Sequence, residues 1–178
     1  MRITGGTLKG RRFSPPSNFR ARPTTDMAKE NLFNILTNFI DFSEIKMVDL
    51  FSGTGSISFE FASRGCKDIC SIENDYQHYK FICKCVEQLQ LSEIVKPVKQ
   101  NVFLFLQKAP KNYFDIIFAD PPFELRTISQ LPKLILDANI LKKDGYLIVE
   151  HGPNVDFSKT DKFWQLRHYG KVCFSFFH

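Results

Sequence analysis

The sequence lacks the long apolar runs that membrane insertion or secretion requires. No stretch approaches the roughly 20 consecutive apolar residues that span a bilayer, and the N-terminal segment has no apolar core of a secretory signal. Hydrophobic residues make up 43% of the 178 residues and charged residues 24%, proportions typical of a soluble globular chain rather than a disordered one. We therefore expect one main folded domain, without a membrane partner, in the cytoplasm.

Cysteine pairs with the spacing of metal ligands are also missing. The five cysteines contain no CxxC pair, and no HxxxH pair is present to complete a zinc site. We expect buried, reduced thiols and no structural metal. The cysteines are Cys66, Cys70, Cys83, Cys85 and Cys173.

Acidic residues are absent from the N-terminal segment. The first 25 residues hold six of the 24 basic residues and none of the 19 acidic ones, so the remainder of the chain is close to neutral. This asymmetry predicts a basic arm, residues 1–24, that contacts the phosphates of a nucleic acid, attached to a domain of residues 25–178. The alternative is a solvated tail that only aids solubility. The candidate RNA-binding residues are Arg2, Lys9, Arg11, Arg12, Arg20 and Arg22.

The N-terminal part of the chain has its own pattern. Two strand-like runs within residues 2–13, on either side of Gly5 and Gly6, predict a β-hairpin. Thr24 or Thr25 can then cap a helix that extends to about Ile40.

From residue 46 onward, short apolar runs alternate with segments of helix length. The apolar runs are 47–51, 68–72, 94–98, 114–119 and 146–149, and the helical segments are 56–64, 75–91, 101–109 and 126–138. This order predicts an α/β fold with a mostly parallel sheet and helices on both faces. Runs 163–169 and 171–177, separated by Gly170, predict an antiparallel hairpin at the sheet edge, which brings the sheet to seven strands. The polar segment 151–162 is too short for a full crossover helix.

A glycine turn follows the first of these apolar runs. Asp49 and Phe51 precede Gly53 and Gly55, and a helix is expected to start near residue 56. Such a strand, turn and helix bind nucleotide cofactors because glycine lets the backbone approach a ligand. A dinucleotide fingerprint would need a third glycine where Ser58 stands, which disfavours NAD and FAD. S-adenosylmethionine has no pyrophosphate to seat there, and the carboxylate of Asp49 suits its cationic methionine part.

A carboxylate marks the end of the next apolar run. Glu73 lies 18 residues after Gly55. At the carboxyl end of a strand, such a side chain can accept hydrogen bonds from both ribose hydroxyls of a nucleotide. The alternative is a surface glutamate that begins a helix.

The most specific motif is Asp120-Pro121-Pro122-Phe123, which follows an apolar strand. The prolines fix the backbone and remove two N–H donors, so neighbouring carbonyls act as acceptors. Asp120 and the Pro121 carbonyl can accept the two hydrogen bonds of a planar amine, and Phe123 can stack on the base. A stiff turn with no chemical role is the alternative. Together with the other two motifs, the tetrapeptide predicts methyl transfer to an exocyclic amine.

These motifs resemble those of class I amino-methyltransferases with an N/D-P-P-Y/F signature. The chain resembles the bacterial RsmD family along its whole length, and the most specific part of this resemblance lies in four N-terminal sequences. They are Arg2-Ile-Thr-Gly-Gly, Lys9-Gly-Arg-Arg, Arg22-Pro-Thr-Thr-Asp and Glu30-Asn-Leu-Phe-Asn. The resemblance implies a Rossmann-like fold, S-adenosylmethionine as cofactor, and methylation of the exocyclic N2 of one guanine in 16S ribosomal RNA. The partner is then 16S rRNA or the assembling small subunit.

The same resemblance implies roles for particular residues. The Gly53–Gly55 loop, Glu73, Asn74 and Asn101 are expected to contact the cofactor. Thr24 and Thr25, in the Arg22-Pro-Thr-Thr segment, are expected near its methionine end and the target base, while the basic hairpin holds RNA.

Other functions share part of this pattern. A DNA or other nucleic-acid amino-methyltransferase acting on adenine N6 uses the same chemistry, although such enzymes usually carry a separate base-recognition region. Protein-glutamine methyltransferases usually have Asn in place of Asp120 and an added helical domain. A non-catalytic RNA-binding module that retains the fold is the alternative from a different class.

Overall fold

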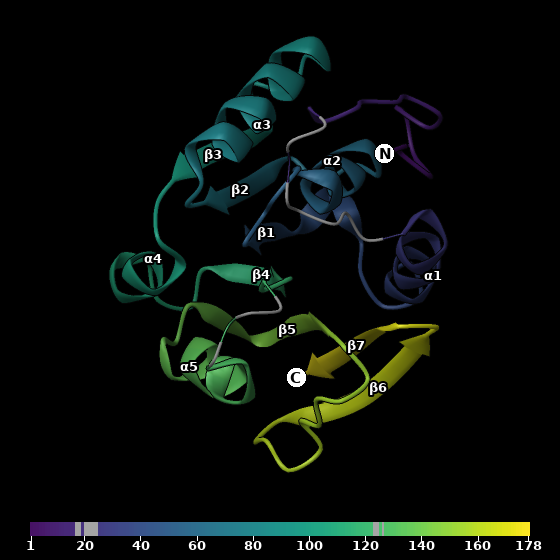
Figure 1. Cartoon of the computed structure of the whole chain (residues 1–178). Helices are drawn as coiled ribbons and strands as arrows, with labels where there is room; N and C mark the ends of the chain where they lie inside the picture. Colours follow the sequence, from purple (N-terminus) through teal and green to yellow (C-terminus); the bar gives the residue numbers. More distant parts are fainter. Residues whose placement is uncertain (17–18, 20–24, 123–124, 126) are drawn as a thin grey trace.

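The computed structural model describes residues 1–16, 19, 25–122, 125 and 127–178. Seven strands form one sheet in the order β3-β2-β1-β4-β5-β7-β6, in which β1 to β5 are parallel and β7 lies antiparallel between β5 and β6 (Figure 1). The predicted parallel sheet with an antiparallel C-terminal hairpin is therefore confirmed. The strands are β1 Lys46–Leu50, β2 Asp68–Glu73, β3 Val95–Lys99, β4 Phe114–Ala119, β5 Leu141–His151, β6 Phe163–Tyr169 and β7 Val172–Phe177.

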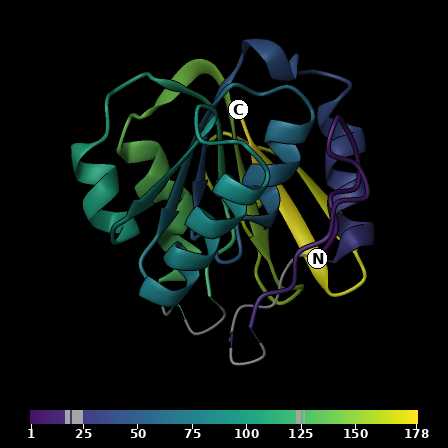
Figure 2. The same ribbon diagram turned by 90° about the horizontal axis from the view of Figure 1, so that it is seen from above.

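Helices cover both faces of the sheet, as Figure 2 shows. They are α1 Asp26–Leu36, α2 Ser56–Ser63, α3 Tyr76–Gln88, α4 Val102–Lys108 and α5 Leu131–Asp137, with short 3-10 turns at Phe42–Glu44 and Ile128–Gln130. One core joins the sheet to α1, α2 and α3, and includes Phe33, Phe61 and Ile82. The second core joins the opposite face to α4 and α5, and includes Leu106 and Ile135. Successive residues of a strand face opposite sides, so Met47 enters the first core and Val48 the second.

The predicted N-terminal hairpin forms in part. Residues 1–3 run antiparallel to residues 10–13 through a bridge between Arg2 and Arg12 and through backbone hydrogen bonds, among them one from the N–H of Ile3 to the carbonyl oxygen on the opposite side at 3.0 Å, but neither segment is a regular strand. The backbone N–H groups of Thr4 and Gly5 donate to the carboxylate of Glu60 on α2 instead of to an opposing strand. Residues 1–13, called the N-terminal arm below, therefore pack along α2 as a wide loop.

Two other predicted boundaries also change. Helix α1 ends at Leu36 rather than near Ile40, and the hydroxyl of Thr37 at its C-cap donates to the Phe33 carbonyl. Such bonds compete with regular helix extension. Strand β5 begins at Leu141, five residues before the apolar run, because Leu141 already pairs with Phe114 of β4. The ammonium of Lys142 also pairs with Asp115 on that strand.

Three features bear on the predicted absences. Within the described ranges, none of the helices is both long and apolar enough to cross a bilayer. The described residues also contain no cluster of three or more His, Cys, Asp or Glu side chains able to hold a metal ion. All five cysteines are free, but Cys70 and Cys83 are only half-buried, so the expectation of five buried thiols is wrong for these two.

Candidate active site

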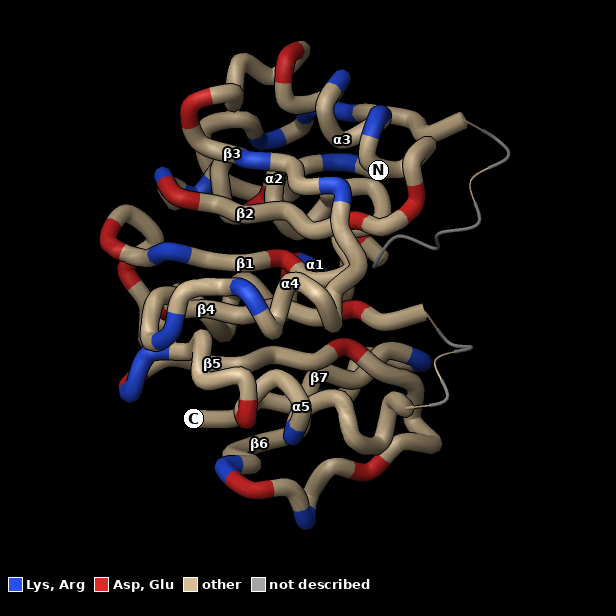
Figure 3. The backbone as a smooth tube through the Cα atoms, turned by 90° about the vertical axis from the view of Figure 1, so that its left-hand side faces the viewer, with Lys and Arg blue, Asp and Glu red and all other residues tan. Residues whose placement is uncertain are grey.

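The strand order brings the predicted motifs to one edge of the sheet. Strand β1 lies between β2 and β4, and the residues that follow these three strands therefore meet at their carboxyl ends. Successive strands are added on one side of β1 up to β3 and on its other side from β4 onward, so the strand order reverses between β1 and β4 although the two strands are parallel. Ligands of open α/β folds bind at such a point. In Figure 3 the acidic positions at the ends of β1, β4 and β5 gather at this edge.

The turn after β1, called the glycine loop and comprising residues 51–55, has an unusual backbone. Phe51, Gly53 and Gly55 all have positive φ angles, of 60°, 55° and 74°. A Cβ atom on Gly55 would lie 2.8 Å from a ring carbon of Phe59, so packing on α2 as well as backbone conformation requires glycine there. Positive φ at Phe51 is uncommon for a bulky residue, and such strain concentrates at functional sites.

Glu73 ends β2 directly beside this loop. Its Oε2 accepts a hydrogen bond from the N–H of Gly53 at 2.8 Å, and its Oε1 accepts one from the N–H of Asp75 at 2.7 Å. A carboxylate offers about four acceptor positions, so roughly two remain for the two ribose hydroxyls of a nucleotide. The predicted role of Glu73 thus fits the geometry.

The other predicted cofactor contacts near β2 and β3 differ in what they can offer. Asn74 is exposed. Asn101 caps α4, and its Oδ1 accepts from the N–H groups of Phe103 and Leu104. A neutral amide can both donate and accept hydrogen bonds, but these capping bonds leave mainly the NH2 group of Asn101 for a ligand.

Asp49 is only 2% exposed and lies on the face of β1 that packs on α2. Its Oδ2 accepts hydrogen bonds from the hydroxyl of Ser58 at 2.7 Å and from the Ser58 N–H at 3.2 Å. Burial raises the pKa of Asp49 to about 7, the bonds from Ser58 oppose this shift, and the charges of Glu73 and Glu150 add to it. In the sequence, Ser58 served only as an argument against a dinucleotide cofactor. In the structure, Ser58 donates two hydrogen bonds that orient the Asp49 carboxylate.

Asp120 begins the turn after β4, and its N–H donates to the Leu50 carbonyl of β1 at 3.4 Å. Part of the residue remains accessible, but desolvation of its carboxyl raises the Asp120 pKa well above its ordinary value, and the charges of Glu150 and Asp49 raise it further. Asp49, Asp120 and Glu150 therefore form a group of carboxyl groups that affect one another electrostatically. The sequence missed Glu150; an acidic residue directly after the apolar run 146–149 was the available signal.

The proline turn is described only in part. Pro121 is buried and Pro122 is exposed, and the Pro122 carbonyl accepts a hydrogen bond from the N–H of Leu125. This bond shapes the turn, and it uses the carbonyl oxygen of Pro122 rather than that of Pro121. Phe123 lies outside the described residues.

The predicted contacts from the N-terminal region have mixed outcomes. Thr25 is the N-cap of α1, and its side chain accepts from the N–H of Ala28 at 3.2 Å. Arg2 pairs with Asp26 and Glu30 of α1. Three further basic residues of the arm are exposed, and no described acidic side chain forms an ion pair with them: Lys9, Arg11 and Arg12. Arg20, Arg22 and Thr24 lie outside the described residues.

Comparison with known proteins gives consistent similarities. Residues 1–178 match the family described as conserved hypothetical protein 95. Ribosomal RNA small subunit methyltransferase D of Haemophilus influenzae is 35% identical over 153 residues, which cover 84% of this chain and 78% of that protein. The solved structure of the Escherichia coli protein yhhF matches with a TM-score of 0.82 at 26% identity, covering 99% of this chain and 96% of that one.

A more distant structure supports the fold alone. The Thermus thermophilus 16S rRNA N2 methyltransferase RsmC, solved in complex with AdoMet and guanosine, matches with a TM-score of 0.69 at 18% identity. The match covers 89% of this chain and 44% of that one. The predicted class I methyltransferase fold is confirmed by these likenesses.

Proposed function

The chain belongs to the RsmD-type family described as conserved hypothetical protein 95, and we propose that it methylates the exocyclic N2 amine of a guanine in 16S ribosomal RNA, with S-adenosylmethionine as cofactor. The observation that carries this proposal is the position of Asp120. It lies at the carboxyl end of β4, and its backbone N–H donates to Leu50, the last residue before the glycine loop. A carboxylate that can accept hydrogen bonds from an amine therefore lies beside the glycine loop, which suits the cofactor.

The residues present fit this cofactor. When bound, S-adenosylmethionine supplies a methyl group already activated on a sulfonium, so no metal or covalent nucleophile is needed. The free acceptor positions of Glu73 suit the ribose hydroxyls, and the positive φ angles of Gly53 and Gly55 let the backbone approach a ligand. The buried carboxylate of Asp49 favours the cationic part of the ligand.

The residues of the chain contribute to the reaction mainly by holding the target amine in position. The target guanine leaves its stack, which costs a few kcal/mol unless it already lies in a loop. The Asp120 carboxylate and the Pro121 carbonyl accept the two N–H bonds of the amine and turn its lone pair toward the methyl group. Phe123 stacks on the base.

Asp120 also suits the role of proton acceptor. As the amine nitrogen bonds to the methyl carbon and the bond from that carbon to sulfur breaks, S-adenosylhomocysteine would be left and the amine would lose one proton, which the Asp120 carboxylate would take up. An ordinary aspartate, with a pKa of about 4, is a poor base at pH 7. Desolvation and the charges of Glu150 and Asp49 raise the Asp120 pKa, which makes the carboxylate a better base.

Contacts with RNA come from the N-terminal arm. Lys9, Arg11 and Arg12 are exposed on it, and each cation that neutralises a phosphate releases a counterion. Because Arg2 pairs with Asp26 and Glu30, its main contribution is to hold the arm on α1. Because the proposed substrate is ribosomal RNA, we expect the protein in the cytoplasm.

The test is a map of methylated nucleosides in 16S rRNA from cells with and without this gene. We expect one N2-methylguanosine to disappear without the gene and to return with the wild-type protein but not with Asp120→Ala. The variant should keep its affinity for S-adenosylhomocysteine, because Asp120 acts on the amine. Loss of an N6-methyladenosine instead would show that adenine, and not guanine, is the target. An unchanged map together with no affinity for S-adenosylhomocysteine would indicate a non-catalytic RNA-binding module. Full turnover by Asp120→Ala would contradict the role of this residue.

A further inference from the structure

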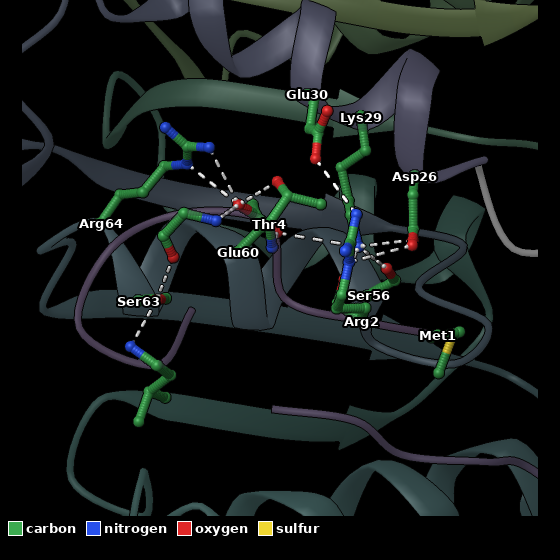
Figure 4. A network of polar contacts seen from close by, with 12 residues as sticks. Met1, Arg2, Thr4, Asp26, Lys29, Glu30, Ser56, Glu60, Ser63 and Arg64 are labelled. Carbon is green, nitrogen blue, oxygen red and sulfur yellow. Dashed lines mark hydrogen bonds and ion pairs between the residues drawn. The ribbon is translucent and has the colours of Figure 1, made fainter. Parts of the chain in front are cut away.

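A buried lysine connects three separate parts of the chain. Lys29, on α1, is 1% exposed. Its ammonium donates to the carbonyl oxygen of Arg2 in the N-terminal arm at 2.6 Å and to the hydroxyl of Ser56 at 3.0 Å. It also lies 3.7 Å from Oε2 of Glu60 on α2. Figure 4 shows Lys29 between these groups.

Glu60 holds the arm from the other side. This side chain is fully buried, and its Oε2 accepts from the N–H of Thr4 at 2.9 Å. Its Oε1 accepts from the Thr4 hydroxyl at 2.7 Å and from the N–H of Gly5 at 2.9 Å. Arg64 also pairs with this oxygen, at 3.0 Å (Figure 4). Buried charged side chains, Lys29 and Glu60, therefore hold the N-terminal arm in place.

Such a network resists partial rearrangement. Burial lowers the pKa of Lys29, while the charges of Glu60 and Asp26 raise it. A buried charge that loses one partner is strongly destabilised, because no water replaces the lost bond. The arm cannot leave Lys29 and Glu60 without leaving both charges short of partners.

The same ammonium reaches the glycine loop through Ser56. Ser56 is the first residue of α2 and directly follows Gly55, so its position sets where the loop ends. A second contact supports the connection, since the hydroxyl of Thr54 in the loop donates to Sδ of Met1 at 2.8 Å. Thioether sulfur is a weak acceptor, which leaves Lys29 as the stronger of the two links.

We propose that Lys29 is a positioning residue that couples the N-terminal arm to the glycine loop, so that binding of cofactor and binding of RNA strengthen each other. The inference rests on the proposed function, because it takes the loop as the cofactor site and the arm as the RNA site. Coupling of this kind is reciprocal: if an ordered loop favours the docked arm, an arm held on RNA favours the ordered loop.

Hydrogen–deuterium exchange of the full-length protein tests this coupling without RNA. The N–H groups of Thr4 and Gly5 report on the arm, and S-adenosylhomocysteine serves as the ligand. We expect saturating ligand to slow exchange in the glycine loop and to slow exchange at Thr4 and Gly5 roughly fivefold or more, the lower end of usual coupling between sites. Lys29→Met should retain the effect in the loop and lose the effect on the arm.

Two further variants separate coupling from stability. Ser56→Ala removes only the link to the loop and keeps the buried ion pair, so it should also lose the effect on the arm, even if Lys29→Met fails to fold. Arg64→Met is the matched control: it removes a cation from the same Glu60 carboxylate but contacts neither Ser56 nor the Arg2 carbonyl, and it should keep the effect.

The outcomes are distinct. Ligand binding that protects the loop but not the arm in the wild-type protein would overturn the coupling and leave the proposed function standing. Full protection of the arm in Ser56→Ala would overturn the role of Lys29. Absence of any binding by the wild-type protein would overturn the proposed function, and the coupling with it.

Discussion

Replacing Asp49 with asparagine should make the ligand-free protein more stable while weakening its preference for a cationic cofactor. The Asp49 carboxyl is buried, and burial raises its pKa from an ordinary value of 3.8 to about 7. The oxygen of an asparagine can still accept both hydrogen bonds from Ser58. The substitution therefore removes a charge that the fold tolerates poorly and keeps most of the local geometry.

The magnitude follows from the shift in pKa. A rise of about three pKa units corresponds to about 4 kcal/mol, at roughly 1.4 kcal/mol per unit. Because the folded state holds the proton more tightly than the unfolded state, stability falls as the pH rises from about 4 to about 7 and is constant above that range. The penalty on the wild-type protein is thus about 2 kcal/mol at pH 5.5 and about 4 kcal/mol at pH 8.

Unfolding in urea at these two pH values measures the effect. The new amide adds a contribution that does not depend on pH, so the informative quantity is the change in the difference between variant and wild type. We expect the free energy of unfolding of Asp49→Asn, relative to wild type, to increase by about 2 kcal/mol from pH 5.5 to pH 8. This change corresponds to roughly 4–8 °C in Tm for a domain of this size.

A second aspartate provides the control. Asp41 is exposed, and the N–H and hydroxyl of Ser43 donate to it, which lowers its pKa. Asp41 is ionised at both pH values, so the free energy of unfolding of Asp41→Asn, relative to wild type, should not change from pH 5.5 to pH 8. If Asp49→Asn behaves in the same way, Asp49 is not the strained buried carboxyl described above.

Binding completes this test. Asp49→Asn should bind S-adenosylmethionine roughly tenfold less tightly at pH 8, a loss of about 1.4 kcal/mol. It should bind S-adenosylhomocysteine, which lacks the sulfonium charge, with a smaller loss. An unchanged ratio of the two affinities would show that the carboxylate does not serve the sulfonium.

The remaining predictions concern the arm and the glycine loop. Charge reversal at Arg11 and Arg12 should weaken RNA binding and lower the slope of log K against log salt by about 2. Lys143→Glu, at an exposed position near the start of β5, should not change the slope, and equal slopes in a filter-binding titration would mean that the arm is only solvated. Gly55→Ala should lose about 1–3 kcal/mol in urea unfolding, because φ is 74° and the new Cβ lies 2.8 Å from a ring carbon. Gly152→Ala, with no atom within 4 Å, should be nearly neutral, and similar losses in both would rule out this steric reason.

The sequence by itself determined the fold class and the edge of the sheet where the site lies. Alternating apolar runs and helical segments predicted the parallel sheet, and Gly170 between two strand-like runs predicted the C-terminal hairpin. The glycine turn after Asp49 and the proline turn after Asp120 were recognisable for the same reason. Each depends on residues close together in the chain, where backbone preference and periodicity act directly.

Only the tertiary structure decided how the charged residues pair. Lys29, Glu60 and Thr4 have no local pattern that links them, yet they form one buried network, and Thr4 and Glu60 are 56 residues apart. The predicted hairpin therefore pairs only through residues 1–3 and 10–13, because the N–H groups of Thr4 and Gly5 donate to the Glu60 carboxylate and not to an opposing strand. A buried charge is stable only with partners that the folded chain brings to it, so these pairings follow from the assembled fold and not from sequence spacing.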